Sequence, residues 1–305
     1  MESQTSKIIS GIFISNILAV IIVGIAKFLT PQAGYSDVII FSVFFIVPFL
    51  MGIFNGWQWH DMKMRAVKVI GWCIVSTRLS VVLSAIFLGE GTICLFIVSP
   101  VILAMMVAGT FIGREVYRRK NNTLKSSLLG VLALFFVADV VSEHESLEMV
   151  SDTLIINAPV EKVWPFVVEY EPITLKENYW LFQAGMPSPV QSTVDGHEAG
   201  AGRKCIFSNG YVFDEKMVVY KPNEELTFDI ISQPRDPEIM GHIDITRGQF
   251  ILKDNGDGTT TLIGNSWYKL YVFPSWYFNL WSESITRNVH LRVMDHIKIL
   301  SEENV

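Results

Sequence analysis

The sequence predicts two parts: an all-α membrane region of four or five helices, followed by an α+β domain in which an antiparallel sheet surrounds one long C-terminal helix. Three observations predict this architecture. The N-terminal part carries long apolar stretches, the middle alternates short β-rich segments with turn residues, and the last segment has apolar residues at three- and four-residue intervals. With 305 residues, 50% of them hydrophobic, and a mean hydropathy of +0.37, the chain is too apolar for one ordinary soluble domain.

Charge is distributed unevenly between the two parts. Residues 1–149 contain 11 Lys and Arg against 9 Asp and Glu, a formal charge of +2, whereas residues 150–305 contain 13 against 21, a formal charge of −8. An acidic soluble part lacks the excess of Lys and Arg that binds phosphates, so nucleic acid is excluded as a partner. The cysteines, Cys73, Cys94 and Cys205, are too few and scattered for a disulfide framework. We expect no metal and no cofactor.

The membrane region is predicted to cover residues 1–141. Its apolar spans are close to the ~20 residues that a bilayer requires, at 8–28, 38–54, 69–88 and 92–112. A fifth stretch, 124–141, is short. If it crosses the membrane the C-terminal domain is extracytoplasmic, and if it lies in the interface that domain is cytoplasmic. We favour crossing, because residues 128–137 are almost wholly apolar rather than two-faced.

Basic residues between the spans predict the orientation. They gather in the segments 57–68 and 114–125, which the positive-inside rule places in the cytoplasm together with the N-terminus. Arg78 is a single cation near the middle of the third span. It either snorkels or binds backbone carbonyls, or it pairs with Asp139 of the fifth span. A channel or transporter would place several polar groups inside its spans, and the sequence indicates essentially one.

The α+β domain is predicted at 149–305, after a polar linker at 142–148. A strand starting at Met149 precedes a helix at 160–168, and the chain closes with a helix at 274–303. The run 254–258 resembles a calcium loop, but it lacks the closing glutamate and is interpreted as a hairpin turn. Between the two helices, turn residues separate further strand candidates at 190–194, 203–207, 212–220, 226–231, 242–253 and 259–271.

Several sequence words resemble the START-like or SRPBCC superfamily, which includes polyketide cyclase/dehydrase-like and lipid-binding proteins. They are TLIINAPVEKVWPFVV at 153–168, VYKPNEELTFDI at 219–230, and the closing stretch 258–303. The sequence is similar to a bacterial subset of this superfamily that has a multi-span N-terminal region. The resemblance implies a helix-grip fold, in which an apolar cavity lies between the sheet and the C-terminal helix, in a multi-pass protein of the bacterial cytoplasmic membrane.

A cavity in such a fold would be lined by alternate strand residues and by the C-terminal helix, although a slip of one residue would exchange the two faces of a strand. Phe228, Ile230 and Ile285 could equally be plain core. Arg247 and Gln249 either bind an anionic headgroup or lie on the solvated face. The candidate ligand-binding residues are Phe207, Tyr211, Phe228, Ile230, Arg247, Gln249, Trp267, Trp281, Ile285 and His290.

These residues favour a membrane-anchored, non-enzymatic protein that binds a lipid or apolar small molecule. One alternative is a cyclase- or dehydratase-like enzyme in which His290 or Tyr268 moves protons. Another is a membrane sensor or assembly factor that binds a partner protein. No set of nucleophile, base and orienting group is visible at a recognisable spacing, so no catalytic residue is assigned. His290 has a structural alternative, as a partly buried histidine bonded to backbone.

Overall fold

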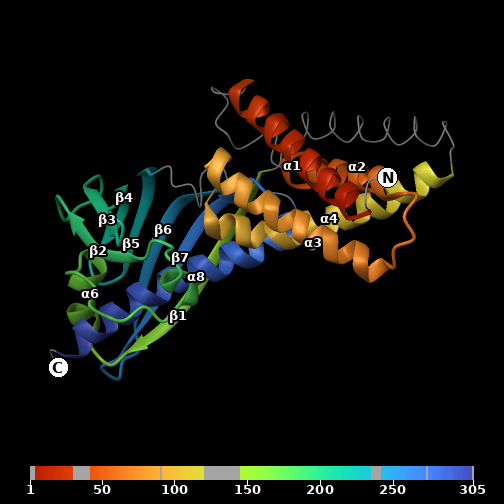
Figure 1. The fold of residues 1–305 in the computed structure, drawn as a ribbon. Coiled ribbons are helices and arrows are strands. Elements are labelled where there is room, and N and C mark those ends of the chain that lie inside the picture. The colour runs from red at the N-terminus through yellow and green to blue at the C-terminus, as the bar shows by residue number, and fades with distance from the viewer. Residues whose placement is uncertain are drawn as a thin grey trace. The chain divides into compact units, whose positions relative to one another are not determined.

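The computed structural model describes residues 4–29, 42–89, 91–119, 145–234, 242–272 and 274–303 (Figure 1). The chain divides into two compact units, one of residues 1–144 with 237–241 and one of residues 145–236 with 242–305. The first is helical and the second combines a sheet with helices. The predicted fifth span and Asp139 lie outside the described residues.

Four α-helices are described in the helical unit. Among the described residues, three segments are long and apolar enough to cross a membrane: Gln4–Ile25, Ala66–Leu88 and Thr92–Arg118. They overlap the predicted spans one, three and four, while the predicted second span lies partly outside the described residues. The elements are α1 (Gln4–Leu29), η1 (Ser42–Ile46), α2 (Val47–Trp59), α3 (Ala66–Leu83), η2 (Ser84–Leu88) and α4 (Thr92–Arg118).

An apolar stripe runs along the exposed side of α1. Its residues recur every four positions, so they share one side of the helix. An exposed stripe of this kind suits contact with lipid rather than with water. Its members are Ile9, Phe13, Ile17, Ile21 and Ile25.

Helices α2 and α4 pack backbone against backbone through two pairs of glycines spaced four residues apart. A Cβ atom at Gly52 would lie 2.2 Å from the carbonyl oxygen of Met106, and one at Gly109 would lie 2.1 Å from that of Phe49. Cβ atoms at Gly56 and Gly113 would lie 2.5 Å and 2.7 Å from carbonyl oxygens of the partner helix. This small-xxx-small arrangement allows close approach of apolar helices, whose association in lipid relies on van der Waals packing.

The second unit contains one antiparallel sheet in the order β1-β7-β6-β5-β4-β3-β2. The β6–β7 hairpin turns at the run 254–258, where Gly256 and Gly258 have φ of 78° and 83°, which favours glycine. Strand β1 begins already at Ser146, inside the range predicted as a linker. The strands are β1 (Ser146–Ile156), β2 (Pro189–Val194), β3 (Gly202–Phe207), β4 (Val212–Lys221), β5 (Glu225–Ser232), β6 (Ile243–Asp254) and β7 (Thr260–Leu270).

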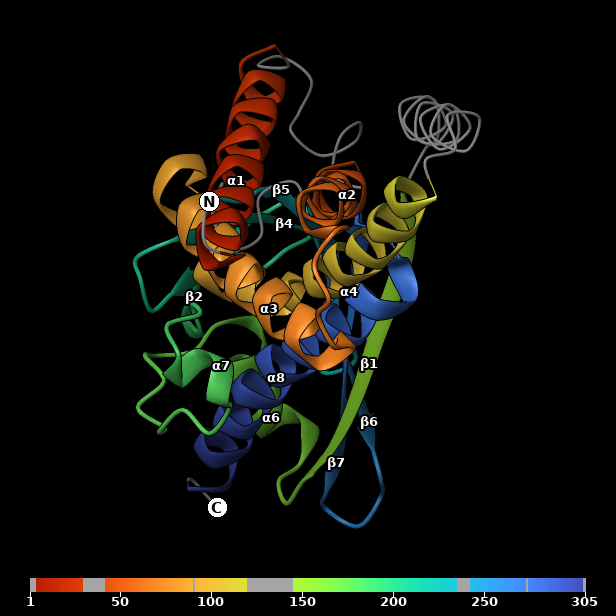
Figure 2. The same cartoon turned by 45° about the vertical axis from the view of Figure 1, so that its right-hand side comes forward.

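Helix α8 (Ser275–Glu302) lies along the inner face of this curved sheet, beside β1, while α6 (Val160–Val168) and the short α7 (Trp180–Gln183) precede the meander (Figure 2). Fully buried Met294 and Ile297 of α8 pack in one core with residues of the sheet and of α6. The predicted helix-grip fold is therefore confirmed. Other core members include Ile156, Val163, Val167, Met217, Leu226 and Leu262.

The glycine contact between α2 and α4 predicts a specific sensitivity. Gly109→Ala should destabilise the full chain in detergent, because the added methyl group overlaps the backbone of α2 and overpacking costs about 1–3 kcal/mol. The measurement is the midpoint of thermal or denaturant unfolding of the purified protein.

Gly71→Ala is the matched control, since a Cβ at this α3 position meets nothing within 4 Å. It should leave the midpoint unchanged or raise it, because alanine favours a helix by up to about 1 kcal/mol. Equal midpoints for the two variants would contradict the close packing of α2 on α4.

Candidate functional site

A polar cluster lies between α8 and the first and last strands of the sheet. Strands β1 and β7 pair antiparallel with Val150 opposite Ser266 and Asp152 opposite Gly264. Because side chains alternate along a strand, Asp152 and Ser266 project from the same face, the one that α8 covers. His290 of α8 lies between them. The fold thus brings together three residues that are far apart in the sequence.

Hydrogen bonds connect these three side chains in a row. Nε2 of His290 lies 2.6 Å from Oγ of Ser266, and Nδ1 lies 3.0 Å from Oδ2 of Asp152. The other carboxylate oxygen of Asp152 accepts a bond of 2.7 Å from Arg287, which also binds Glu283 at 3.0 Å. Asp152 and His290 are buried, whereas Ser266 is only partly buried. We call Ser266, His290 and Asp152 the polar triad.

The environment keeps the imidazole of this triad neutral. Burial lowers the pKa of His290, and the nearby Asp152 opposes that effect without reversing it. A carboxylate can only accept hydrogen bonds, so Nδ1 carries the proton and donates a hydrogen bond to Asp152. Nε2 then carries a lone pair, and it accepts a hydrogen bond from the hydroxyl group of Ser266. This is the tautomer in which a histidine acts as a base toward a hydroxyl group.

A second polar group lies on the same face of β7. The hydroxyl of Tyr268 donates to Oδ1 of Asn279 at 2.7 Å, and the amide of Asn279 reaches Glu148 at 3.5 Å. Burial, followed by the charges of Glu148 and Glu283, raises the pKa of Tyr268. Tyr268 therefore stays protonated at neutral pH. It is a hydrogen-bond donor there and not a base.

Two of the predicted ligand residues, Phe228 and Ile230, belong to the core or pack against it, and the others have various surroundings. Phe207 packs against Phe213 with 4.7 Å between ring centroids, and Phe228 lies in the core with the guanidinium of Arg203 4.5 Å from its centroid. Ile230 is packed against the same core. Trp281 and Ile285 of α8 are partly buried. The ring centroids of Trp281 and of Trp180 in α7 are 6.5 Å apart. Tyr211 lies in the β3–β4 connection.

Three other candidate residues lie on the outer face of the sheet, which for Arg247 and Gln249 was one of the two alternatives. Trp267 follows Ser266 directly and therefore points away from α8. Arg247 binds Asp229, and Gln249 binds Glu225, on that same outer face. A bulge between Ile245 and Arg247 shifts the register, and the outer face has its own hydrogen-bond network, so alternation of polar and apolar residues does not distinguish the faces.

Asp152, Ser266 and Arg287 are the residues that sequence reasoning missed. The triad members come from β1, β7 and α8, and 138 positions separate Asp152 from His290, so no local motif contains them. One signal was available: Asp152 occupies an inward position of a strand whose neighbouring inward residues, Val150 and Leu154, are apolar. A carboxylate at such a position requires a buried partner.

A second set of buried charged groups lies on β3 and β4. Arg203 and Glu215 form an ion pair and are almost fully buried. Burial raises the pKa of Glu215, and it raises the pKa of the neighbouring Cys205 thiol to about 12. Cys205 is therefore no reactive thiolate. Arg203 also stacks on Phe228, so this ion pair links β3 and β4 to the core. Neither member of the pair is a neutral base.

The helical unit contains its own polar cluster, beside a small pocket. The side chain of Asn16 donates to Ser76 at 3.0 Å and accepts from Ser80 at 2.7 Å, while Ser15 donates to Asn55 at 3.2 Å. The expectation of essentially one polar group inside the spans is thus wrong. These bonds join α1 to α2 and α3 within apolar surroundings. Arg78 lies on an exposed side of α3.

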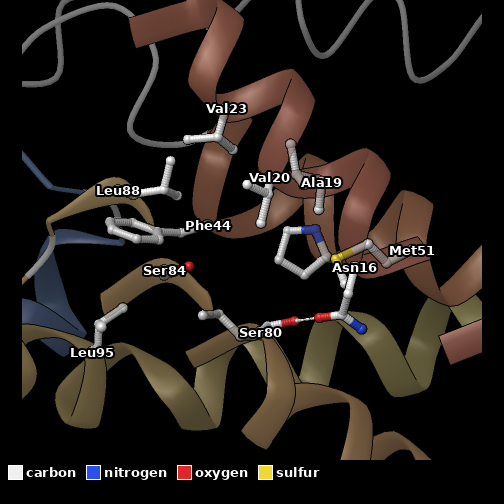
Figure 3. Close-up of a pocket in the computed structure, with 13 residues that line it drawn as sticks. Asn16, Ala19, Val20, Val23, Phe44, Met51, Ser80, Ser84, Leu88 and Leu95 are labelled. Atoms are coloured by element: carbon white, nitrogen blue, oxygen red, sulfur yellow. Dashed lines mark hydrogen bonds between the residues drawn. The ribbon is translucent and has the colours of Figure 1, made fainter. Parts of the chain in front are cut away.

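The pocket has a volume of about 60 Å³ and is mostly apolar (Figure 3). Asn16 and Ser80 meet at one end of it, and Phe44 and Leu88 lie at the other. Because the amide of Asn16 is already bonded to Ile12 of its own helix and to Ser76 and Ser80 of α3, the pocket offers few free polar groups. It is a packing gap between helices and not a polar binding site.

Comparisons with known proteins concern the fold alone. No family model matches the chain, and no curated protein matches it. Similar solved structures include norcoclaurine synthase from Thalictrum flavum (12% identity, 52% of this chain, 96% of that chain, TM-score 0.37) and the Zhui aromatase/cyclase from a Streptomyces species (11%, 52%, 94%, 0.36). A third is a START superfamily protein from Mycobacterium smegmatis (11%, 52%, 99%, 0.37). At these identities and scores, the similarities carry no argument about activity.

The buried histidines predict how stability depends on pH. Burial lowers the pKa of His290 and of His296 in the folded chain, so below the ordinary value of about 6.5 the unfolded chain binds more protons. The free energy of unfolding should therefore fall as the pH falls from about 7 to about 5. In His290→Gln this fall should be smaller, measured by denaturant unfolding of the full chain at several pH values.

His197→Gln is the control, because the side chain of His197 is exposed. It should retain the pH dependence of the parent protein. The charged groups facing His290 are Asp152 of β1 and Arg287 of α8. An identical fall in the parent and in His290→Gln would show that His290 is not held neutral.

Proposed function

We propose that this protein is a membrane-anchored binding protein for a lipid or another hydrophobic small molecule, held in the interior of the helix-grip domain. The observation that supports this most is the hydrogen-bonded polar triad in the buried interface between α8 and the sheet. Buried polar groups cost stability, and a fully apolar interface would fold as well. Such groups are retained where they give orientation and specificity to a ligand. The partly buried Ser266 is the triad member that a ligand can reach.

Attachment to the membrane fits a ligand of this class. Three described segments have the length and hydropathy of membrane spans, and the helix-grip unit follows them in the same chain. An apolar molecule that leaves the bilayer then crosses little water before it is bound. We place the protein in a bacterial cytoplasmic membrane, with the basic segments 57–68 and 114–125 inside and the C-terminal domain outside.

One observation favours a second candidate function, an enzyme that moves protons on the bound molecule. His290 is neutral, and Asp152 fixes its tautomer, which are the properties of a general base. Cyclase- and dehydratase-like reactions need such a group beside a carbonyl compound. If the protein is an enzyme, His290→Gln should still bind the compound but should no longer convert it. If it is a carrier, the parent protein itself should convert no bound compound.

Binding is tested by filling the interior beside the triad. Ser266→Trp introduces a large side chain on the face that α8 covers, so it should exclude a ligand and lower its occupancy at least tenfold, equivalent to about 1.4 kcal/mol. The measurement is native mass spectrometry of the full chain, released from detergent after incubation with a panel of lipids and apolar compounds.

Ser151→Trp is the matched control. Ser151 lies on β1 opposite Asn265, on the exposed outer face, so the same substitution there should leave occupancy unchanged. Ser266→Leu provides a smaller change if the tryptophan variant folds poorly. Equal occupancy in all variants, or no retained compound in the parent protein, would reject an interior binding site.

A further inference from the structure

We infer that Ser266 is a nucleophile and that the polar triad cleaves esters of apolar acyl groups. This inference rests on the proposed function, because the substrate must first be bound inside the helix-grip domain. It goes beyond that function by assigning a reaction, a reacting atom and a substrate class.

The three residues occupy the positions that a nucleophile, its base and an orienting group require. The Oγ–Nε2 distance of 2.6 Å and the Nδ1–Oδ2 distance of 3.0 Å are both within hydrogen-bond range. The same order of hydroxyl, imidazole and carboxylate recurs on unrelated folds, and it is recognised by geometry and not by sequence position. Its appearance on a helix-grip sheet therefore needs no shared ancestry.

The orientation of the imidazole is fixed from the side opposite to Ser266. Asp152 uses one oxygen for His290 and the other for Arg287, so it cannot rotate without losing one of two bonds. Arg287 is itself held by Glu283, one turn earlier on α8. The lone pair of Nε2 consequently stays aimed at the hydroxyl of Ser266. Asp152 and Arg287 are positioning residues, and His290 is the base.

Exposure decreases along the triad in the order that catalysis needs. The side chains of Asp152 and His290 are 4% and 7% exposed, so water is kept from the base and from the orienting group. Ser266 as a residue is only partly buried.

Other serines of the interior do not share this arrangement. Ser301 donates to the carbonyl oxygen of Ile297 in its own helix. Ser192 of β2 is buried, and its hydroxyl has no hydrogen-bond partner. Among the serine hydrogen bonds that the structure shows in the described part of the chain, that of Ser266 is the one made to an imidazole. Ser192 is therefore a suitable control for a buried serine without a base.

The reaction proceeds in two balanced steps. Oγ of Ser266 forms a bond to the carbonyl carbon of the ester while its proton passes to Nε2 of His290. The bond from that carbon to the alkoxy oxygen then breaks, and the leaving alcohol takes the proton from His290. Water attacks the resulting acyl-serine and gives a proton to the same nitrogen, which returns it to Ser266 as the carboxylic acid leaves. No oxidant or further reactant is required.

The surroundings of the triad select the substrate class. On the side of the triad toward the core, the inner face carries the apolar residues Val150, Leu154 and Leu262, while Tyr268 lies on its other side. Such a site binds an uncharged ester with a hydrocarbon acyl chain better than a charged or short-chain ester, because burial of apolar area supplies the binding energy. Nitrophenyl esters of increasing acyl length are suitable probes.

The decisive test is covalent labelling of the full chain with a fluorophosphonate, a reagent that reacts with activated serines. Peptide mass mapping should place the phosphonate on Ser266, and Ser266→Ala should abolish it. His290→Gln should slow labelling by about 10²–10⁴-fold, the usual contribution of a general base. Asp152→Asn should also slow it, because an amide can donate to Nδ1 and so favour the wrong tautomer. Ser192→Ala and Ser151→Ala should label at the parent rate.

A purely structural triad would not give a pH profile. The labelling rate of the parent protein should rise as His290 loses its proton and level off near neutrality, and nitrophenyl esters should be hydrolysed with the same profile. Labelling of another serine, or no labelling of a folded parent protein, would overturn the inference. If compounds are then still retained in native mass spectra, the proposed binding function stands without it. If no compound is retained and no serine is labelled, both fall.

Discussion

The burial of α8 against the curved sheet is the contact on which the rest of the helix-grip domain depends. The helix contributes to the apolar core and, through His290, to the polar triad. Met294 and Ile297, fully buried, pack with the sheet and α6, and His290 lies one turn earlier on that side. A displacement of α8 that opened the core would also separate His290 from Asp152 of β1. Stability and the geometry of the site are therefore set by the same interface.

Two buried polar arrangements in this domain have different chemical capacities. Arg203 and Glu215 are both ionised partners at nearly full burial, and removing either would leave an uncompensated charge, a loss of about 3–5 kcal/mol. The triad instead contains a neutral imidazole whose two nitrogens have different partners. A proton can enter or leave that imidazole, whereas the guanidinium of Arg203 cannot release one at neutral pH. Proton transfer in this domain is accordingly expected at His290.

Much of the fold could be predicted from the sequence because its signals are local. The periodicity of residues 274–303 predicts the helix that the structure places at Ser275–Glu302, and the helix at 160–168 has the predicted bounds. Turn residues bound the strands in the same way. The candidate site was harder to predict, because it depends on which side chains of each strand point toward α8. Trp267 and Tyr268 are adjacent, large and aromatic, so hydrophobicity alone does not tell which of them faces α8.

Contacts between distant segments caused the larger errors. The hydrogen bond between His290 and Asp152 forms only when β1 is paired with β7 and α8 is packed on the sheet. No spacing of residues along the chain predicts that contact. The polar cluster of Asn16 and its serines has the same origin. Each of these residues looks like a tolerated small polar group within its own helix, and their mutual hydrogen bonds appear only when α1 and α3 are placed together.

Anchoring and chemistry are connected through the partitioning of the proposed substrate. An apolar ester concentrates in a bilayer, so a domain fixed beside that bilayer meets the ester at a higher local concentration than a free domain would. A modest affinity is then sufficient, and the apolar inner face can supply it without many polar contacts. The polar triad is left to recognise the one polar group of the molecule, its ester carbonyl. That division would give the three hydrogen-bonded residues of the triad a role that the ion pair of Arg203 and Glu215 does not have.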